Sequence, residues 1–163
     1  MDDSQERRPE DSLLRGSAEL ATEADTRELG ARFGEQLNAG DVVVLSGPLG
    51  AGKTMLAKGI AVGMDVDGPV TSPSYVLARV HAARRLGRPA MVHVDMYRLL
   101  DSGSTDLIGE LDSLDLDTDL DDAVVVVEWG EGLAERLSDS HLDIRLERAD
   151  NDTRTAVWHW SRA

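Results

Sequence analysis

The sequence predicts a three-layer α/β fold with a mostly parallel central sheet and antiparallel additions, and three observations lead to this prediction. Two aliphatic runs of strand length, at residues 41–46 and 123–129, are typical of strands that are covered on both faces. A glycine-rich loop at residues 47–52 follows the first run, and a helical pattern follows the loop. Segments at about 74–98 and 141–160 each contain two strand-like stretches joined by a turn, which predicts antiparallel hairpins.

The helices are predicted from spacing and from their end signals. Residues 22–39 have apolar side chains at helical spacing, and a glycine predicts where this helix ends. Thr22 and Asp25 have the spacing of a capping box, in which two side chains satisfy backbone N–H groups at a helix start. A second helix follows the glycine-rich loop and runs to about Met64, and a short helix is expected at about 131–138.

The length of the chain bounds its domain organisation. With 163 residues, it is long enough for one domain and too short for two ordinary ones. Residues 1–11 are polar, charged and aperiodic, which predicts a disordered tail before a single domain over residues 12–163. No apolar run is long enough to cross a bilayer or to serve as a signal peptide, so we expect a cytoplasmic protein without a membrane partner.

The charge and composition exclude several classes of function. A formal net charge of −14 disfavours direct nucleic-acid binding through a broad basic face. The absence of cysteine excludes disulfides, thiolate zinc sites and cysteine nucleophiles. The only lysines are Lys53 and Lys58, and both lie beside the glycine-rich loop. An anionic ligand would therefore need positive charge assembled at that loop, or a metal ion.

The stretch "GPLGAGKT", Gly47 to Thr54, has the spacing of a phosphate-binding loop, or P-loop. Its glycines let successive backbone N–H groups point at phosphate oxygens. Lys53 supplies a positive charge to the β and γ phosphates, and the Thr54 hydroxyl is suited to bind Mg²⁺. A strand before the loop and a helix after it are the context that this motif requires. The sequence therefore predicts a P-loop NTPase fold that binds a nucleoside triphosphate and Mg²⁺.

Two carboxylates at strand ends complete a hydrolytic site in this prediction. Asp95, in "MVHVDMYR", is placed to hold Mg²⁺ through water or to orient an attacking water. Glu128 closes the second aliphatic strand and is a candidate direct ligand of Mg²⁺. The alternative for either residue is an ordinary charge that faces solvent. His93, two residues before Asp95, is expected to be a packed or surface histidine, because the four histidines show no zinc-binding spacing.

A second loop, "VTSPSY" at residues 70–75, follows the P-loop helix where a switch loop would lie. Thr71 or Ser72 would contact the γ phosphate or Mg²⁺ when such a loop closes, and Ser74 belongs to the same segment. Taken without further context, hydroxyl side chains beside a proline favour ordinary turn chemistry.

The class of P-loop protein follows in part by elimination. A GTPase needs the guanine-binding motif N/T-K-x-D, and neither lysine of the chain is followed two residues later by aspartate. A small-molecule kinase would usually bring an arginine-rich lid, whereas "ARRLGR" lies at an expected hairpin tip. A compact ATPase or switch remains, with a small-molecule kinase or a non-catalytic nucleotide-sensing module as alternatives.

Four motifs together resemble one family. "GPLGAGKT", "VTSPSY", "HVDMYR" and "EWGE", in this order, resemble the TsaE (YjeE) family of bacterial ATPases. Those proteins typically contain G-D-L-G-A-G-K-T, S-P-T-[FY], H-x-D-x-Y-R and E-W-x-E. The resemblance extends from about Thr22 to Val157. Pro48 replaces the usual aspartate of the loop, and Ser74 replaces a threonine.

The resemblance implies a function. Members of this family serve threonylcarbamoyl modification of adenosine 37 in tRNA. They bind a TsaB–TsaD heterodimer, and their Mg²⁺-dependent ATP hydrolysis resets that complex for further turnover. The resemblance therefore implies ATP and Mg²⁺ as cofactors, a TsaB–TsaD-like heterodimer as partner, and only indirect contact with tRNA.

The resemblance also implies roles for individual residues. The phosphates would lie against Leu49, Gly50, Ala51, Gly52, Lys53 and Thr54. Thr54 and Glu128 are the implied Mg²⁺ ligands, and Asp95 acts at the γ phosphate or its water. Trp129 flanks the site and Arg154 lies near the nucleotide, whereas Thr22 or Glu23 is the implied contact near the adenine. We therefore expect Lys53, Asp95 and Glu128 to be the catalytic residues.

Overall fold

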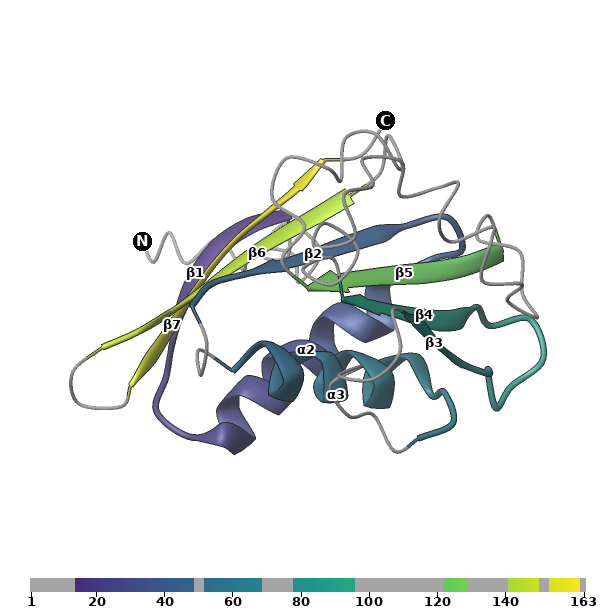
Figure 1. Ribbon diagram of the computed structural model, residues 1–163, viewed down its shortest axis with the longest axis horizontal. Coiled ribbons are helices and arrows are strands. Elements are labelled where there is room, and N and C mark those ends of the chain that lie inside the picture. The colour runs from purple at the N-terminus through teal and green to yellow at the C-terminus, as the bar shows by residue number, and fades with distance from the viewer. Residues whose placement is uncertain are drawn as a thin grey trace, which may run out of the picture.

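The computed structural model describes residues 14–48, 52–68, 78–95, 122–128, 141–149 and 153–161. In chain order, the elements of this part are β1 (Arg15–Leu20), α2 (Glu23–Gln36), β2 (Val42–Ser46), α3 (Lys53–Met64), β3 (Ala78–His81), β4 (Ala90–Asp95), β5 (Ala123–Glu128), β6 (His141–Arg148) and β7 (Arg154–Ser161) (Figure 1). None of the helices described is long and apolar enough to cross a membrane.

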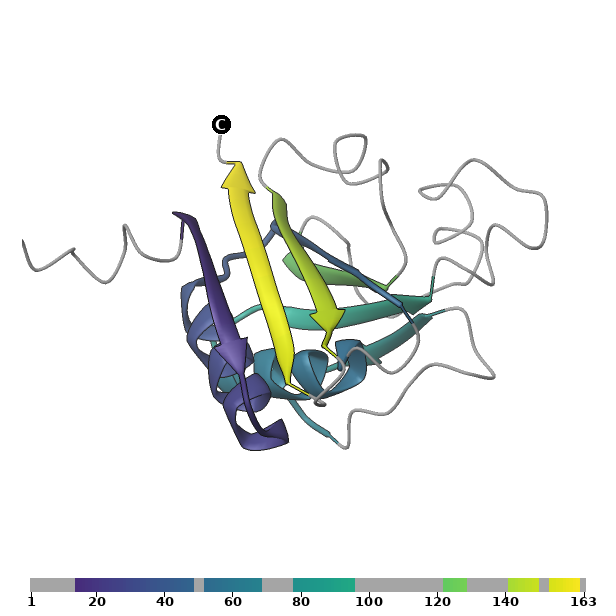
Figure 2. The same cartoon turned by 90° about the vertical axis from the view of Figure 1, so that its left-hand side faces the viewer.

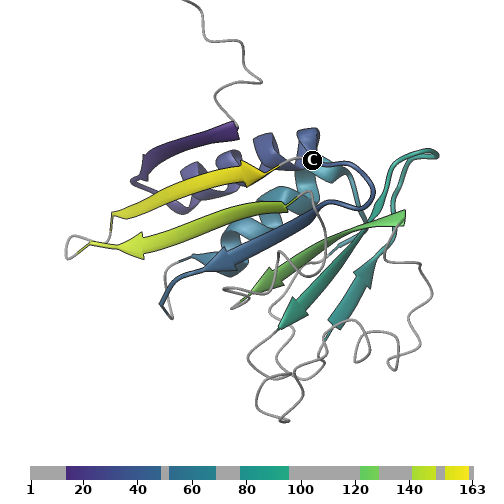
Figure 3. The same ribbon diagram turned by 90° about the horizontal axis from the view of Figure 1, so that it is seen from above.

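The strands form one seven-stranded mixed sheet in the order β1-β7-β6-β2-β5-β4-β3 (Figure 3). The four central strands, β6, β2, β5 and β4, are parallel to one another. The outer strands are added antiparallel: β3 pairs with β4 at one edge, and β7 and β1 follow β6 at the other. The predicted α/β fold with a parallel centre and two hairpins is thus confirmed.

Strand β1 was not expected from the sequence, which indicated no strand before the first helix. It pairs antiparallel with β7, from Arg15 opposite His159 to Leu20 opposite Arg154. Its side chains are largely exposed, so it lacks the aliphatic run that reveals a buried strand. Gly16 lies directly against the ring of Trp158, because a Cβ built there would be 2.6 Å from a ring carbon.

The predicted helix boundaries are confirmed at three of four ends. Thr22 caps α2 with the expected capping box: the Asp25 N–H donates to the Thr22 hydroxyl at 3.1 Å, and the Thr22 N–H donates to the Asp25 carboxylate at 3.1 Å. Helix α2 ends at Gln36, before the predicted end at 39. Helix α3 begins at Lys53 and ends at Met64, as expected.

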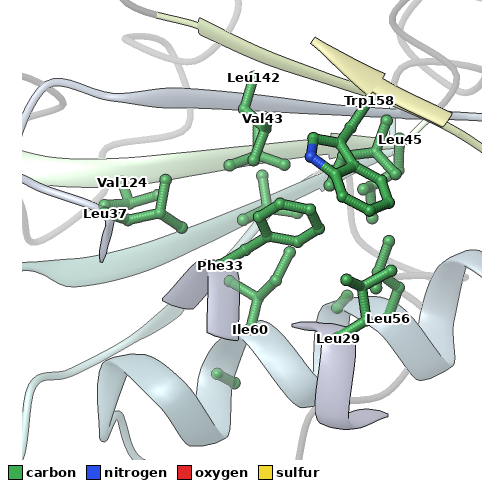
Figure 4. Packing of buried hydrophobic residues seen from close by; sticks show 14 of the residues in the cluster. Leu29, Phe33, Leu37, Val43, Leu45, Leu56, Ile60, Val124, Leu142 and Trp158 are labelled. Atoms are coloured by element: carbon green, nitrogen blue, oxygen red, sulfur yellow. The ribbon is translucent and has the colours of Figure 1, made fainter. Parts of the chain in front are cut away.

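Both helices lie on one face of the sheet (Figure 2), and the main hydrophobic core fills the space between. Phe33 of α2 meets Trp158 of β7 edge to face, with ring centroids 5.3 Å apart. Ile60 of α3 and Leu45 of β2 are fully buried in the same cluster (Figure 4). Because α3 is packed against the strand that precedes the P-loop, the start of α3 has a fixed place at the end of β2.

The other face of the central strands carries a second buried apolar cluster. Its buried members are Val42, Val44, Val92, Val94, Ala123, Val125 and Val127. The aliphatic strands are therefore buried on both faces, as their sequences predict. The expected tail at residues 1–11 and the expected helix at 131–138 lie outside the described residues.

Candidate nucleotide site

The candidate site lies where the P-loop joins the end of β2 to the start of α3. Gly47 and Gly52, which flank the middle of the loop, have φ angles of 141° and 101°. These values lie in the region that favours glycine, so the loop's turns depend on residues without a Cβ. Leu49, Gly50 and Ala51, three of the predicted phosphate contacts, lie outside the described residues.

Lys53 is buried, and its side chain contacts oxygens of the loop itself. Its side-chain ammonium donates to the carbonyl oxygens of Gly47 at 2.6 Å and of Pro48 at 3.3 Å. Gly52 forms the N-cap of α3 without a side-chain hydrogen bond. The first turn of α3 therefore presents backbone N–H groups and the positive end of the helix dipole beside the lysine, which is an arrangement that favours an anion.

The two predicted Mg²⁺ ligands are in contact. The Thr54 hydroxyl donates to Oε1 of Glu128 at 3.4 Å. Strands β2 and β5 are parallel neighbours with Leu45 opposite Glu128, so the end of β5 reaches the start of α3. Glu128 is only 5% exposed, which contradicts the alternative of an ordinary solvent-facing charge at this strand end.

A third side chain, for which no role in the site is predicted from the sequence, joins this pair. Nε2 of His93 lies 2.8 Å from Oε2 of Glu128, and His93 is fully buried. Of the two alternatives expected for His93, packed or surface, the structure has the packed one, with a carboxylate as its partner. Strand alternation already placed His93 on one face with Asp95, but it did not place either residue beside Glu128.

Asp95 occupies the neighbouring register position. It ends β4, and its Cα is paired with that of Glu128 across the parallel β4–β5 ladder. Both strand-end acidic positions therefore lie at the same edge of the sheet as the P-loop, where ligands of parallel α/β sheets bind. The side chain of Asp95 is outside the described part.

Arg154 and Thr26 lie beside Gly52 of the loop. The Arg154 side chain packs against Gly52: a Cβ built on that glycine would lie 3.1 Å from Cδ and 3.3 Å from Nε of Arg154. The same point is 3.8 Å from Cγ2 of Thr26, which is one helical turn beyond Thr22. Arg154 is therefore beside Gly52 of the P-loop. The Thr22 hydroxyl already accepts the capping bond from Asp25.

Several predicted site residues are not described. Trp129 and the switch-loop residues Thr71, Ser72 and Ser74 lie outside the described ranges. Within those ranges, no group of three or more His, Asp or Glu side chains is arranged to hold a metal ion. What the described residues offer is a hydroxyl and a carboxylate in contact, beside an anion-binding helix start.

Comparisons with known proteins identify the family of this chain. The model of the family described as "Threonylcarbamoyl adenosine biosynthesis protein TsaE" matches residues 20–156. A Mycobacterium tuberculosis protein named tRNA threonylcarbamoyladenosine biosynthesis protein TsaE is 72% identical over 149 residues, covering 91% of this chain and 89% of that protein. A Streptomyces coelicolor protein of the same name is 53% identical over 133 residues, covering 82% and 86%.

A solved structure shows the same fold. The crystal structure of Bacillus subtilis YdiB superposes with a TM-score of 0.67 at 23% identity, covering 91% of this chain and 86% of that one. The family model spans the P-loop, both strand-end carboxylates and Arg154. The chain therefore belongs to the TsaE family.

Proposed function

We propose that this protein is a Mg²⁺-dependent ATP hydrolase that acts in threonylcarbamoyl modification of adenosine 37 in tRNA. Its family and the names of its relatives support a role in tRNA threonylcarbamoyladenosine biosynthesis. The observation that carries the hydrolase proposal is the contact between Thr54 and Glu128, beside Lys53 at the P-loop. Lys53 offers a positive charge for phosphate, and Thr54 and Glu128 offer two oxygen ligands for a metal ion at the same edge of the sheet.

The described residues fit a nucleotide with Mg²⁺. Mg²⁺ prefers oxygen ligands and commonly takes one or two from a protein, with phosphate oxygens and waters completing its shell. Thr54 and Glu128 offer a hydroxyl and a carboxylate in contact. The uncapped start of α3 and the Lys53 ammonium offer donors to phosphate oxygens.

Each residue has a role in hydrolysis under this proposal. Lys53 exchanges its bonds to the Gly47 and Pro48 carbonyls for bonds to the β and γ phosphate oxygens. Thr54 and Glu128 hold Mg²⁺, which when bound neutralises charge on those phosphates. Asp95 orients the attacking water. The water oxygen bonds to the γ phosphorus while the bond to the bridging β–γ oxygen breaks, which yields ADP and inorganic phosphate.

The proposed partner is a TsaB–TsaD-like heterodimer, and the hydrolysis resets this complex for another turnover. The net charge of −14 supports contact with tRNA through such partners and not through this chain. Arg154 is proposed to lie near the nucleotide, and Thr22 or Glu23 near its adenine. Trp129, Thr71, Ser72 and Ser74 are proposed to flank and close it.

The test is an ATPase assay with and without a TsaB–TsaD pair from the same organism. We expect hydrolysis that the pair stimulates, and a fall of about 100-fold or more in Glu128→Ala. Glu147→Ala removes an exposed glutamate of β6 and is the matched control, with wild-type activity expected. Normal hydrolysis by Glu128→Ala would refute the metal assignment. Phosphate found on an added metabolite would indicate a kinase, and tight ATP binding that never leads to hydrolysis would indicate a nucleotide-sensing module.

A further inference from the structure

Glu128 is held at both of its carboxylate oxygens, and the two contacts are unequal. Oε2 lies 2.8 Å from Nε2 of His93, whereas Oε1 accepts from the Thr54 hydroxyl at 3.4 Å. An ionised carboxylate is only an acceptor, so the hydrogen of the shorter contact is on Nε2 of His93. The shorter hydrogen bond thus comes from His93 in the sheet, and the longer one comes from Thr54 at the start of α3.

We propose that His93 is a positioning residue, which anchors Oε2 of Glu128 and so keeps Oε1 directed at Thr54 for a divalent cation. This inference rests on the proposed function, because it assumes that Thr54 and Glu128 share that cation. Residues that hydrogen-bond to a metal ligand orient it and tune its affinity for the metal. His93 would act on the cation through Glu128 and would not touch it.

The surroundings of His93 support this role. It lies on the helix-covered face of β4, beside buried apolar side chains such as Met91 and Val126. Its Nδ1 is buried and has no hydrogen-bond partner among the residues that the structure describes. A buried imidazole that makes a single hydrogen bond stabilises the folded state less than an apolar side chain would at the same position. The contact with Glu128 is what an aliphatic residue could not supply.

The register of the sheet brings His93 and Glu128 together. His93 is paired with Val126 across the parallel β4–β5 ladder, and Glu128 is two residues further along β5 on the same face. His93 and Glu128 are 0% and 5% exposed, so both side chains are packed inside the fold. Oε2 of the carboxylate therefore contacts a central strand of the sheet, whereas Oε1 contacts the start of α3.

Metal binding can be tested separately from activity. We would measure Mn²⁺ binding by electron paramagnetic resonance in the presence of a non-hydrolysable ATP analogue, and binding of the analogue without metal by fluorescence. His93→Leu removes the donor and keeps an apolar volume. We expect its Mn²⁺ affinity to fall by about 10-fold or more, with metal-free nucleotide affinity unchanged. His93→Gln carries a donor at the reach of Nε2 and is expected to restore most of the loss.

His81→Leu is the matched control. His81 is the other buried histidine of the β3–β4 hairpin, and its Nδ1 contacts the Asp67 carbonyl at 2.8 Å instead of Glu128. We expect wild-type Mn²⁺ affinity for this variant. A loss in His81→Leu as large as that in His93→Leu would show a general effect of core disruption and would overturn the proposal.

A double-mutant cycle gives the sharpest result. With Glu128→Ala already present, His93→Leu should change Mn²⁺ affinity no further, because its effect passes through the carboxylate. An equal loss in both backgrounds, or no loss in His93→Leu alone, would overturn the proposal. If His93→Leu does not fold, His93→Asn and His93→Gln are compared instead. The asparagine amide is too short to reach Glu128, so equal affinities of these two variants would also overturn it.

The wild-type measurement separates the two levels of inference. Wild-type protein that binds no Mn²⁺ with the nucleotide analogue would refute the proposed function itself. Wild-type binding that His93→Leu leaves unchanged would refute only the role of His93.

Discussion

Gly59 of α3 lies directly against the backbone of Arg27 in α2, since a Cβ on Gly59 would be 2.2 Å from the Arg27 carbonyl oxygen. A second backbone contact of this kind lies one turn further along α3, where a Cβ on Gly63 would be 2.1 Å from the Ala31 carbonyl oxygen. The two helices therefore pack backbone to backbone. Because α3 begins with Lys53 and Thr54, this packing also positions the P-loop helix.

The first prediction concerns this helix contact. Gly59→Ala should lower the free energy of unfolding by about 1–3 kcal/mol or more, because two backbones must separate to admit one methyl group. Urea unfolding followed by circular dichroism would measure it. Val62→Ala, at an exposed position of the same helix, is the control and should change stability little. A Gly59→Ala protein as stable as the wild type would mean that the helices are not in backbone contact.

The second prediction concerns the two lysines. Lys53→Ala should weaken ATP binding by about 100-fold or more, because the only ammonium group in the P-loop is removed. Lys58→Ala removes the other lysine, one helical turn further along α3, and should bind ATP as the wild type does. Titration with a fluorescent ATP analogue would measure the affinity of each variant. Similar affinities for both variants would contradict the P-loop assignment.

Much of the fold could be predicted because its signals are local. The capping box of α2 needs only Thr22 and Asp25, three residues apart, and β2 and β5 are marked by their unbroken aliphatic runs. Strand β1 has no such signal. Its place depends on pairing with β7, where Arg15 meets His159, and on the fit of Gly16 under Trp158. Contacts between residues so distant in sequence leave no local pattern.

In the candidate site, too, some residues could be predicted from local sequence patterns and others could not. The P-loop spacing marks Lys53 and Thr54, and the end of an aliphatic strand marks Glu128, so these residues could be expected together. The bond between His93 and Glu128 could not, because it depends on the register of β4 against β5. A shift of one residue would turn His93 to the other face of the sheet.

The third prediction concerns the dependence of stability on pH. Burial lowers the pKa of His81 below its ordinary value of 6.5; the hydrogen bond with the Asp67 carbonyl opposes this effect, and electrostatic interactions with His93 and Arg79 add to it. The unfolded chain then binds a proton more readily than the folded one as the pH falls below 6.5. Protonation therefore favours unfolding, and stability is lost between pH 6.5 and the lower pKa of the folded state.

His81→Leu should remove this part of the pH dependence. Between pH 7.5 and 5.5, we expect the wild type to lose more free energy of unfolding than the variant does, as measured by urea unfolding at each pH. His159→Ala removes an exposed histidine of β7 and serves as the control, with the wild-type pH dependence expected. Parallel curves for wild type and His81→Leu would contradict the lowered pKa.

The fourth prediction concerns Arg154, whose side chain lies against Gly52 at the end of the P-loop. Arg154→Ala should weaken ATP binding by about 10-fold, because a guanidinium beside the phosphates is lost. The control is Arg145→Ala, which removes an exposed arginine of β6 whose partner is Glu147 at 3.4 Å. A fluorescence titration would show a loss in the first variant only. Equal affinity of Arg154→Ala and wild type would mean that Arg154 packs against the loop without reaching the nucleotide.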